Sequence, residues 1–75
     1  MTKSTIITDP NILGGKPIIA GTRISVELIM NFLASGMNVD DILLEYKELT
    51  KKEVLSAIAY AAKLVSHPNR LFLSK

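Results

Sequence analysis

The sequence contains no cysteine, no tryptophan and a single histidine among its 75 residues. Without cysteine the chain has no thiol nucleophile, no iron–sulfur ligands and no disulfide framework, which fits a reducing compartment. The histidine, His67, precedes Pro68 at the expected end of a helix, where a positive charge complements the helix dipole. Because no nucleophile, base and orienting group can be assembled, we expect no enzyme, no metal site and no cofactor.

Long apolar runs are also missing. The longest uncharged stretch, 28–39, is interrupted by polar residues and glycine, and residues 1–8 lack the apolar run of a signal peptide. We therefore expect a cytoplasmic protein with no membrane partner. A chain of this size buries only about 60% of the surface that its unfolded form exposes. Because 48% of the residues are hydrophobic, apolar surface is left over, and this predicts a homodimer.

The chain predicts a single domain, 1–75, with two short strands followed by helices. The β-branched runs at about 5–8 and 17–20 indicate the strands. The segment between them is long for a tight hairpin, so they pair either within one chain or across a dimer. Capping residues and apolar spacing predict three helices, at about 26–35, 39–46 and 51–66. The expected fold class is mostly α, a homeodomain-like helix-turn-helix core with a short N-terminal strand pair.

The last two helices and the turn 47–50 between them have the order of a helix-turn-helix, with Leu49 as the apolar residue of the turn. Thr50 and Glu53 form a Thr-x-x-Glu capping box that opens the expected recognition helix. Apolar residues form one stripe along this helix: Val54, Ile58, Ala61, Ala62 and Val65. Candidates for DNA binding are the other side of the helix and two basic residues nearer the N-terminus: Lys51, Lys52, Ser56, Tyr60, Lys63, Lys16 and Arg23.

The distribution of charge fits contact with a polyanion at one face. Basic residues are in excess in 1–25 and 51–75, whereas acidic residues are in excess in 26–50. The C-terminal segment 70–75 is too apolar for an ordinary chain end. Leu71, Phe72 and Leu73 are expected to be buried on the same subunit, across a dimer or in a partner's groove.

Several motifs together are unusual enough to indicate a family: Asp9-Pro10-Asn11-Ile12, Gly14-Gly15-Lys16-Pro17-Ile18-Ile19 and Gly21-Thr22-Arg23-Ile24, followed by Gly36 and Tyr46. From Ile6 to about Ala62, the sequence resembles the short bacterial domain-of-unknown-function family 433. These are antitoxin-like proteins with a homeodomain-like helix-turn-helix. One departure is Lys47, which stands where the family pattern usually has proline.

The resemblance implies an antitoxin that binds a PIN-like ribonuclease toxin and, as a homodimer, binds operator DNA and represses its own operon. The tail residues Leu71, Phe72 and Leu73 would then bind the toxin. For the motif residues Lys16, Thr22 and Arg23, the possible roles are contact with DNA phosphate, with a partner carboxylate or within the fold. The alternative is a protein-interaction module without DNA binding, in which Lys51 and Lys52 are only a solvated helix start. No small-molecule substrate is expected.

Overall fold

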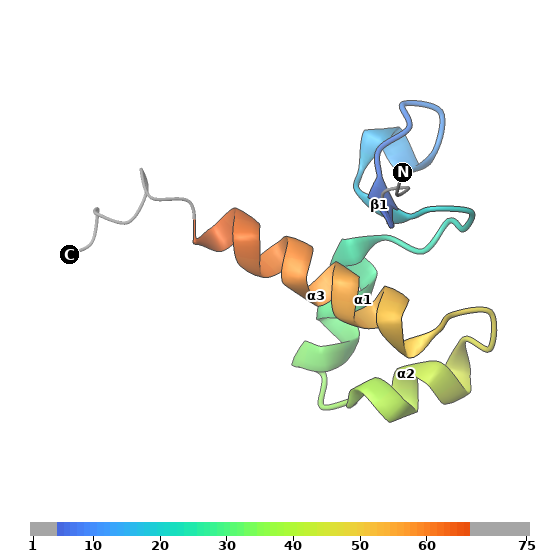
Figure 1. Ribbon diagram of the computed structural model, residues 1–75, viewed down its shortest axis with the longest axis vertical. Coiled ribbons are helices and arrows are strands. Elements are labelled where there is room, and N and C mark those ends of the chain that lie inside the picture. The colour runs from blue at the N-terminus through green and yellow to red at the C-terminus, as the bar shows by residue number, and fades with distance from the viewer. Residues whose placement is uncertain (1–4, 67–75) are drawn as a thin grey trace.

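The computed structural model describes residues 5–66. It contains two strands, β1 (Ile6–Ile7) and β2 (Ile18–Ile19), and three helices, α1 (Val26–Ala34), α2 (Val39–Glu45) and α3 (Lys51–Val65). The strand pair and α2 lie at opposite ends of the molecule, with α1 and α3 packed together between them (Figure 1). The predicted fold class is confirmed, and each helix ends one residue before its predicted end.

The two strands pair within one chain, which decides between the two pairings that the sequence allowed. They run antiparallel, with Ile6 opposite Ile19 and Ile7 opposite Ile18. The connection includes a single 3-10 turn, η1 (Leu13–Gly15), whose residues all have positive φ, from 50° to 88°. Two of these residues are glycines, which adopt this region at little cost. The long connection thus reverses the chain without a tight hairpin turn.

Each α-helix begins at a side-chain cap. Ser25 accepts a hydrogen bond from a backbone N–H in the first turn of α1. Reciprocal capping boxes open the other two helices, Asn38 with Asp41 for α2 and Thr50 with Glu53 for α3. A cap of this kind stabilises a helix by about 1 kcal/mol. These local bonds fix where α3 begins and explain why its start was predictable from sequence.

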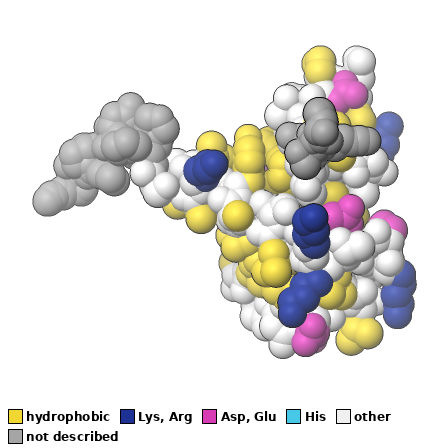
Figure 2. Space-filling model, in the orientation of Figure 1, with side chains coloured by type: hydrophobic (Ala, Val, Ile, Leu, Met, Phe, Trp, Pro, Cys, Tyr) yellow, Lys and Arg dark blue, Asp and Glu magenta, His cyan; other side chains and the backbone are white. Residues whose placement is uncertain are grey.

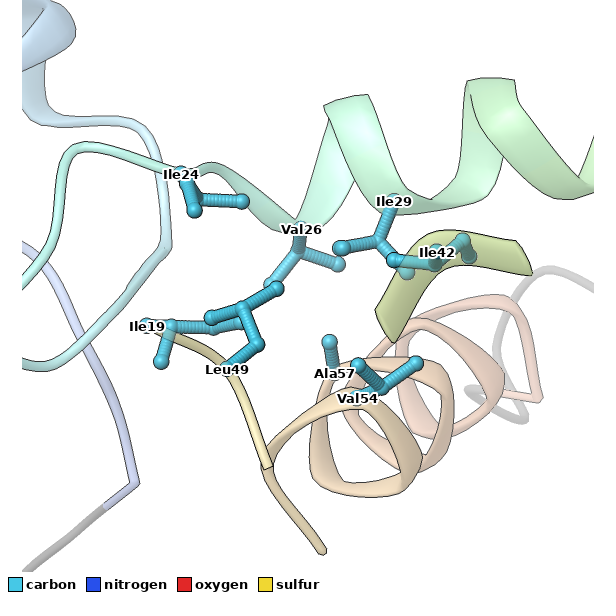
Figure 3. Packing of buried hydrophobic residues seen from close by; sticks show 8 residues of the cluster. All are labelled: Ile19, Ile24, Val26, Ile29, Ile42, Leu49, Val54 and Ala57. Carbon is cyan, nitrogen blue, oxygen red and sulfur yellow. The ribbon is translucent and has the colours of Figure 1, made fainter. Parts of the chain in front are cut away.

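The hydrophobic core lies where the three helices meet. Each helix contributes a fully buried side chain, Ile29 from α1, Ile42 from α2 and Val54 from α3. The cluster is completed by Ile19, Ile24, Val26, Leu49 and Ala57. Figure 3 shows these side chains pointing toward one another between the helices. Burying an aliphatic side chain of this size contributes about 1.5–3 kcal/mol, so the core holds α3 firmly against α1.

The turn between α2 and α3 forms with Lys47 in the place where the pattern of the resembled family usually has proline. The backbone N–H of Leu49 donates to the carbonyl oxygen of Tyr46 at 3.0 Å. Leu49 itself is buried in the core, as predicted for the apolar residue of the turn. Lys47 therefore permits the helix-turn-helix connection.

Replacing Lys47 by proline is expected to raise the free energy of unfolding by about 0.4–1 kcal/mol, because proline restricts the unfolded chain. Lys47 is exposed and does not have a left-handed φ. The preceding residue, Tyr46, has φ −120° and ψ 87°, which lies outside the helical region that a following proline disfavours. Urea unfolding followed by circular dichroism measures the change. Lys47→Ala is the control for losing the side chain, and a proline variant less stable than this alanine variant would contradict the prediction.

Candidate nucleic-acid interface

Three of the predicted DNA-binding residues line one hollow between β1 and α3. Ser56, Tyr60 and Lys63 lie on the α3 side of this β1–α3 hollow, which has a volume of about 370 Å³. Spacings of three and four residues bring side chains to the same side of a helix. Lys63 is exposed, whereas Ser56 and Tyr60 are half-buried. The lining of the hollow therefore combines one exposed positive charge with two half-buried hydroxyl groups.

Other residues of the hollow were missed in the sequence. Ala59 lines it from α3, Ile6 lines it from β1, and Thr5 lines it from the position just before β1. Ala59 lies between Ser56 and Lys63 on the same helical side, so its position follows from the helical spacing. The contribution of β1 depends on a long-range contact between the strand and α3, for which the sequence contains no local signal.

The first turn of α3 adds two further positive charges. Lys51 and Lys52 are both exposed there. Successive residues differ by about 100° around a helix, so Lys52 lies in line with Ser56 and Lys63, whereas Lys51 lies to one side. The start of a helix also favours anions through its free backbone N–H groups and its dipole. The surface formed by Lys51, Lys52 and the β1–α3 hollow is the candidate nucleic-acid interface.

The structure does not bring the remaining basic candidates to this hollow. Lys16 Nζ lies 2.6 Å from Glu27 Oε1, so this lysine pairs with a carboxylate of its own chain. Both side chains are more than half exposed, and such surface pairs contribute only about 0–1 kcal/mol. Arg23 is exposed in the segment between β2 and α1. Neither residue lines the β1–α3 hollow.

Charge on the described surface is mixed. Figure 2 shows Lys and Arg side chains spaced over one face, with acidic side chains beside several of them and apolar side chains along α3. Between residues 5 and 66, no group of three or more acidic or histidine side chains is placed to hold a metal ion. No helix in that range has the length and hydropathy needed to span a bilayer. The predicted partner-binding residues Leu71, Phe72 and Leu73 lie outside the described residues.

Comparison with known proteins tests the family resemblance. Residues 6–61 match the sequence pattern of the family described as protein of unknown function, DUF433. The chain belongs to the DUF433 family. The resemblance carried by its glycine, lysine and Gly-Thr-Arg motifs is thereby confirmed.

A solved structure is similar to this DUF433 chain over most of its length. The crystal structure of a DUF433 member protein from Anabaena variabilis matches it with a TM-score of 0.80 and 25% sequence identity. The match covers 91% of this chain and 67% of that chain. No curated protein matches the sequence.

The Gly-Thr-Arg motif of this DUF433 chain forms the corner between β2 and α1. Gly21 has φ 83°, a conformation that glycine adopts readily. The Thr22 hydroxyl donates to the carbonyl oxygen of Ile19 at 2.8 Å and accepts from the N–H of Ile24 at 3.0 Å. Of the three roles open to Thr22, the structure thus shows the one within the fold.

Proposed function

We propose that this DUF433 protein is an antitoxin that binds operator DNA as a homodimer, represses its own operon and binds a PIN-like ribonuclease toxin. The observation that carries the DNA-binding part is the arrangement of α2, the turn and α3, with Lys51 and Lys52 exposed at the start of α3. This is the order of a helix-turn-helix, whose second helix enters the major groove. The antitoxin part is supported by the family resemblance.

In the proposed complex, α3 lies in the major groove of the operator. Lys51 and Lys52 contact phosphates, and Lys63 contacts a further phosphate along the same helix. Ser56 and Tyr60 are half-buried beside β1, so their hydroxyl groups reach the DNA only from within the β1–α3 hollow. Phosphate contacts therefore dominate affinity, and binding falls steeply as salt rises.

The proposed toxin contact uses residues outside α3. Asp40 and Glu45 are exposed on α2, and their negative charge complements the basic surface that a ribonuclease needs for RNA. The apolar residues Leu71, Phe72 and Leu73 follow α3 in the sequence and suit a hydrophobic groove on the toxin. The two activities would then occupy different parts of one small protein.

A second candidate function is a protein-interaction module without DNA binding. The ion pair between Lys16 and Glu27 favours it, because this lysine already has a carboxylate partner. The formal net charge of +2 favours it as well, since DNA-binding domains are commonly more basic. Dimerisation weakens the argument from net charge, because two copies present twice the charge to one duplex.

Titration of the full chain against its own upstream DNA and an unrelated duplex, at two salt concentrations, tests the DNA-binding part. We expect tighter binding to the upstream DNA and a steep loss of affinity with salt. Lys52→Ala is expected to reduce the slope of log affinity against log salt by about 1, since it removes one phosphate contact. Lys47→Ala removes the same charge from the preceding turn and is expected to leave the slope unchanged. Equal weak binding to both duplexes, or none, would contradict repression and favour the interaction module.

A further inference from the structure

The apolar stripe of α3 that faces the core continues beyond the core. The C-terminal end of α3 projects past the other elements (Figure 1). Val54 and Ala57 are buried, but Leu64 and Val65 are 54% and 73% exposed. On a helix, Leu64 and Val65 flank the line of Val54, Ala57 and Ala61. Leu64 and Val65 thus project from the core-facing side of the last turn of α3, and the described residues cover them only in part.

An apolar groove lies directly beside these side chains, between α1 and α3. Its volume is about 260 Å³, and it is lined on the α1 side by Pro17, Val26, Glu27 and Met30. On the α3 side it is lined by Tyr60, Ala61, Leu64 and Val65. Glu27 is paired with Lys16, so its negative charge at the edge of this α1–α3 groove is balanced.

We propose that the α1–α3 groove binds Leu64 and Val65 of a second copy of this chain, forming a two-fold symmetric dimer. The groove and the projecting side chains of Leu64 and Val65 lie next to each other on one surface of the chain. A two-fold axis near the end of α3 therefore places the apolar side chains of each copy at the groove of the other. Because Glu27 is paired with Lys16 of its own chain, its carboxylate does not enter the proposed contact as an unpaired charge.

The small size of the chain also supports a second copy as the occupant of the α1–α3 groove. A domain of 75 residues is near the lower limit for a self-sufficient core, and association is a common source of the missing stability. The proposed dimer extends the existing core, because Ala61 both packs against the core cluster and lines the groove. It goes beyond the proposed function by placing the dimer interface, and it does not depend on DNA binding.

The dimer also leaves the start of α3 free. Lys51 and Leu64 are separated by about 20 Å along the helix, at 1.5 Å per residue. Contact through the last turn therefore keeps Lys51 and Lys52 of both copies away from the two-fold axis. This separation is compatible with two major grooves about 34 Å apart.

Sedimentation equilibrium of the full chain tests the interface through a matched pair of variants. Leu64→Glu introduces a charge into the groove and is expected to raise the dimer Kd by about 30-fold or more, the loss expected for a central contact residue. Leu55→Glu introduces the same charge on α3 at a residue that is 47% exposed. Leu55 lies nine residues earlier, about 180° around the helix, so its substitution is expected to leave the Kd unchanged.

A second measurement covers the case in which a glutamate variant loses its helical circular dichroism. Because the sequence has no cysteine, Leu64→Cys and Leu55→Cys each introduce one thiol with little change in polarity. The Leu64→Cys thiol is expected to react with a thiol reagent more slowly in concentrated than in dilute protein, because the dimer covers it. The Leu55→Cys thiol is expected to react at the same rate at both protein concentrations.

Three results would overturn the interface. The first is a wild-type chain that stays monomeric at all concentrations. The second is a Leu55→Glu variant that dissociates as fully as Leu64→Glu. The third is a Leu64→Cys thiol whose protection does not depend on concentration, which would indicate that the chain's own C-terminal segment covers the groove. Operator binding is measured separately, so its failure leaves this test unaffected.

Discussion

Replacing Ile29 by alanine is expected to lower the free energy of unfolding by about 2–5 kcal/mol. Ile29 is fully buried in the core cluster formed by the three helices. The substitution removes apolar contacts and leaves a cavity, because close-packed neighbours relax only partly. Small domains have about 5–15 kcal/mol of stability in total, so a large part is lost. Urea unfolding followed by far-ultraviolet circular dichroism, which reports helix content, measures the change.

The control for this core variant is Leu44→Ala on α2. Leu44 is 68% exposed, and substitutions at such surface positions usually change stability by no more than about 0.5 kcal/mol. Both variants must be compared at the same protein concentration, because a dimer adds concentration-dependent stability. Equal destabilisation by Ile29→Ala and Leu44→Ala would contradict the described core.

Thr22→Val is expected to lower the free energy of unfolding by about 1–3 kcal/mol, although it preserves the shape of the side chain. The Thr22 hydroxyl joins Ile19 and Ile24 by two part-buried hydrogen bonds at the corner before α1. Valine leaves the N–H of Ile24 without this acceptor and the carbonyl oxygen of Ile19 without this donor. Thermal or urea unfolding of the two proteins side by side measures the cost.

Thr22→Ser is the matched control, because it keeps the hydroxyl and removes only a methyl group. We expect serine to retain most of the stability that valine loses. A valine variant as stable as the serine variant would show that the two hydrogen bonds contribute little, and Thr22 would then be free for another role in the motif.

Local signals in the sequence were enough to predict the elements. The Thr50 and Glu53 capping box placed the start of α3 at Lys51, where the structure has it. Gly36 follows α1 with φ 105°, a conformation typical of glycine after a helix. Such signals act between residues a few positions apart, so they can be recognised without knowledge of the tertiary structure.

Which side of α3 packs against the core was predicted less well. The apolar stripe expected from sequence included Ala62, which is exposed, and omitted Ala57, which is fully buried. Alanine has a small apolar surface, so its position says little about which side of a helix is buried. The orientation is decided by how closely α1 and α3 approach, and this depends on tertiary packing.

The candidate site combined local and long-range features. Ser56, Tyr60 and Lys63 share a side of α3 because of their spacing, and this was predictable. The β1 wall of the hollow and the ion pair between Lys16 and Glu27 join parts of the chain far apart in sequence. Neither contact could be predicted from residue types, because several charged and apolar partners were equally available.

The continuity of α3 links the two surfaces proposed for this protein. One helix of 15 residues runs from Lys51 at the proposed DNA contact to Val65 at the proposed dimer contact. The two ends of this helix are about 20 Å apart and move together as one rigid element. A rotation of about 10° at the dimer contact would move the start of α3 by about 3.5 Å, close to the rise of one base pair. A ligand or partner that changes how the two copies meet would therefore change which operator spacing they fit.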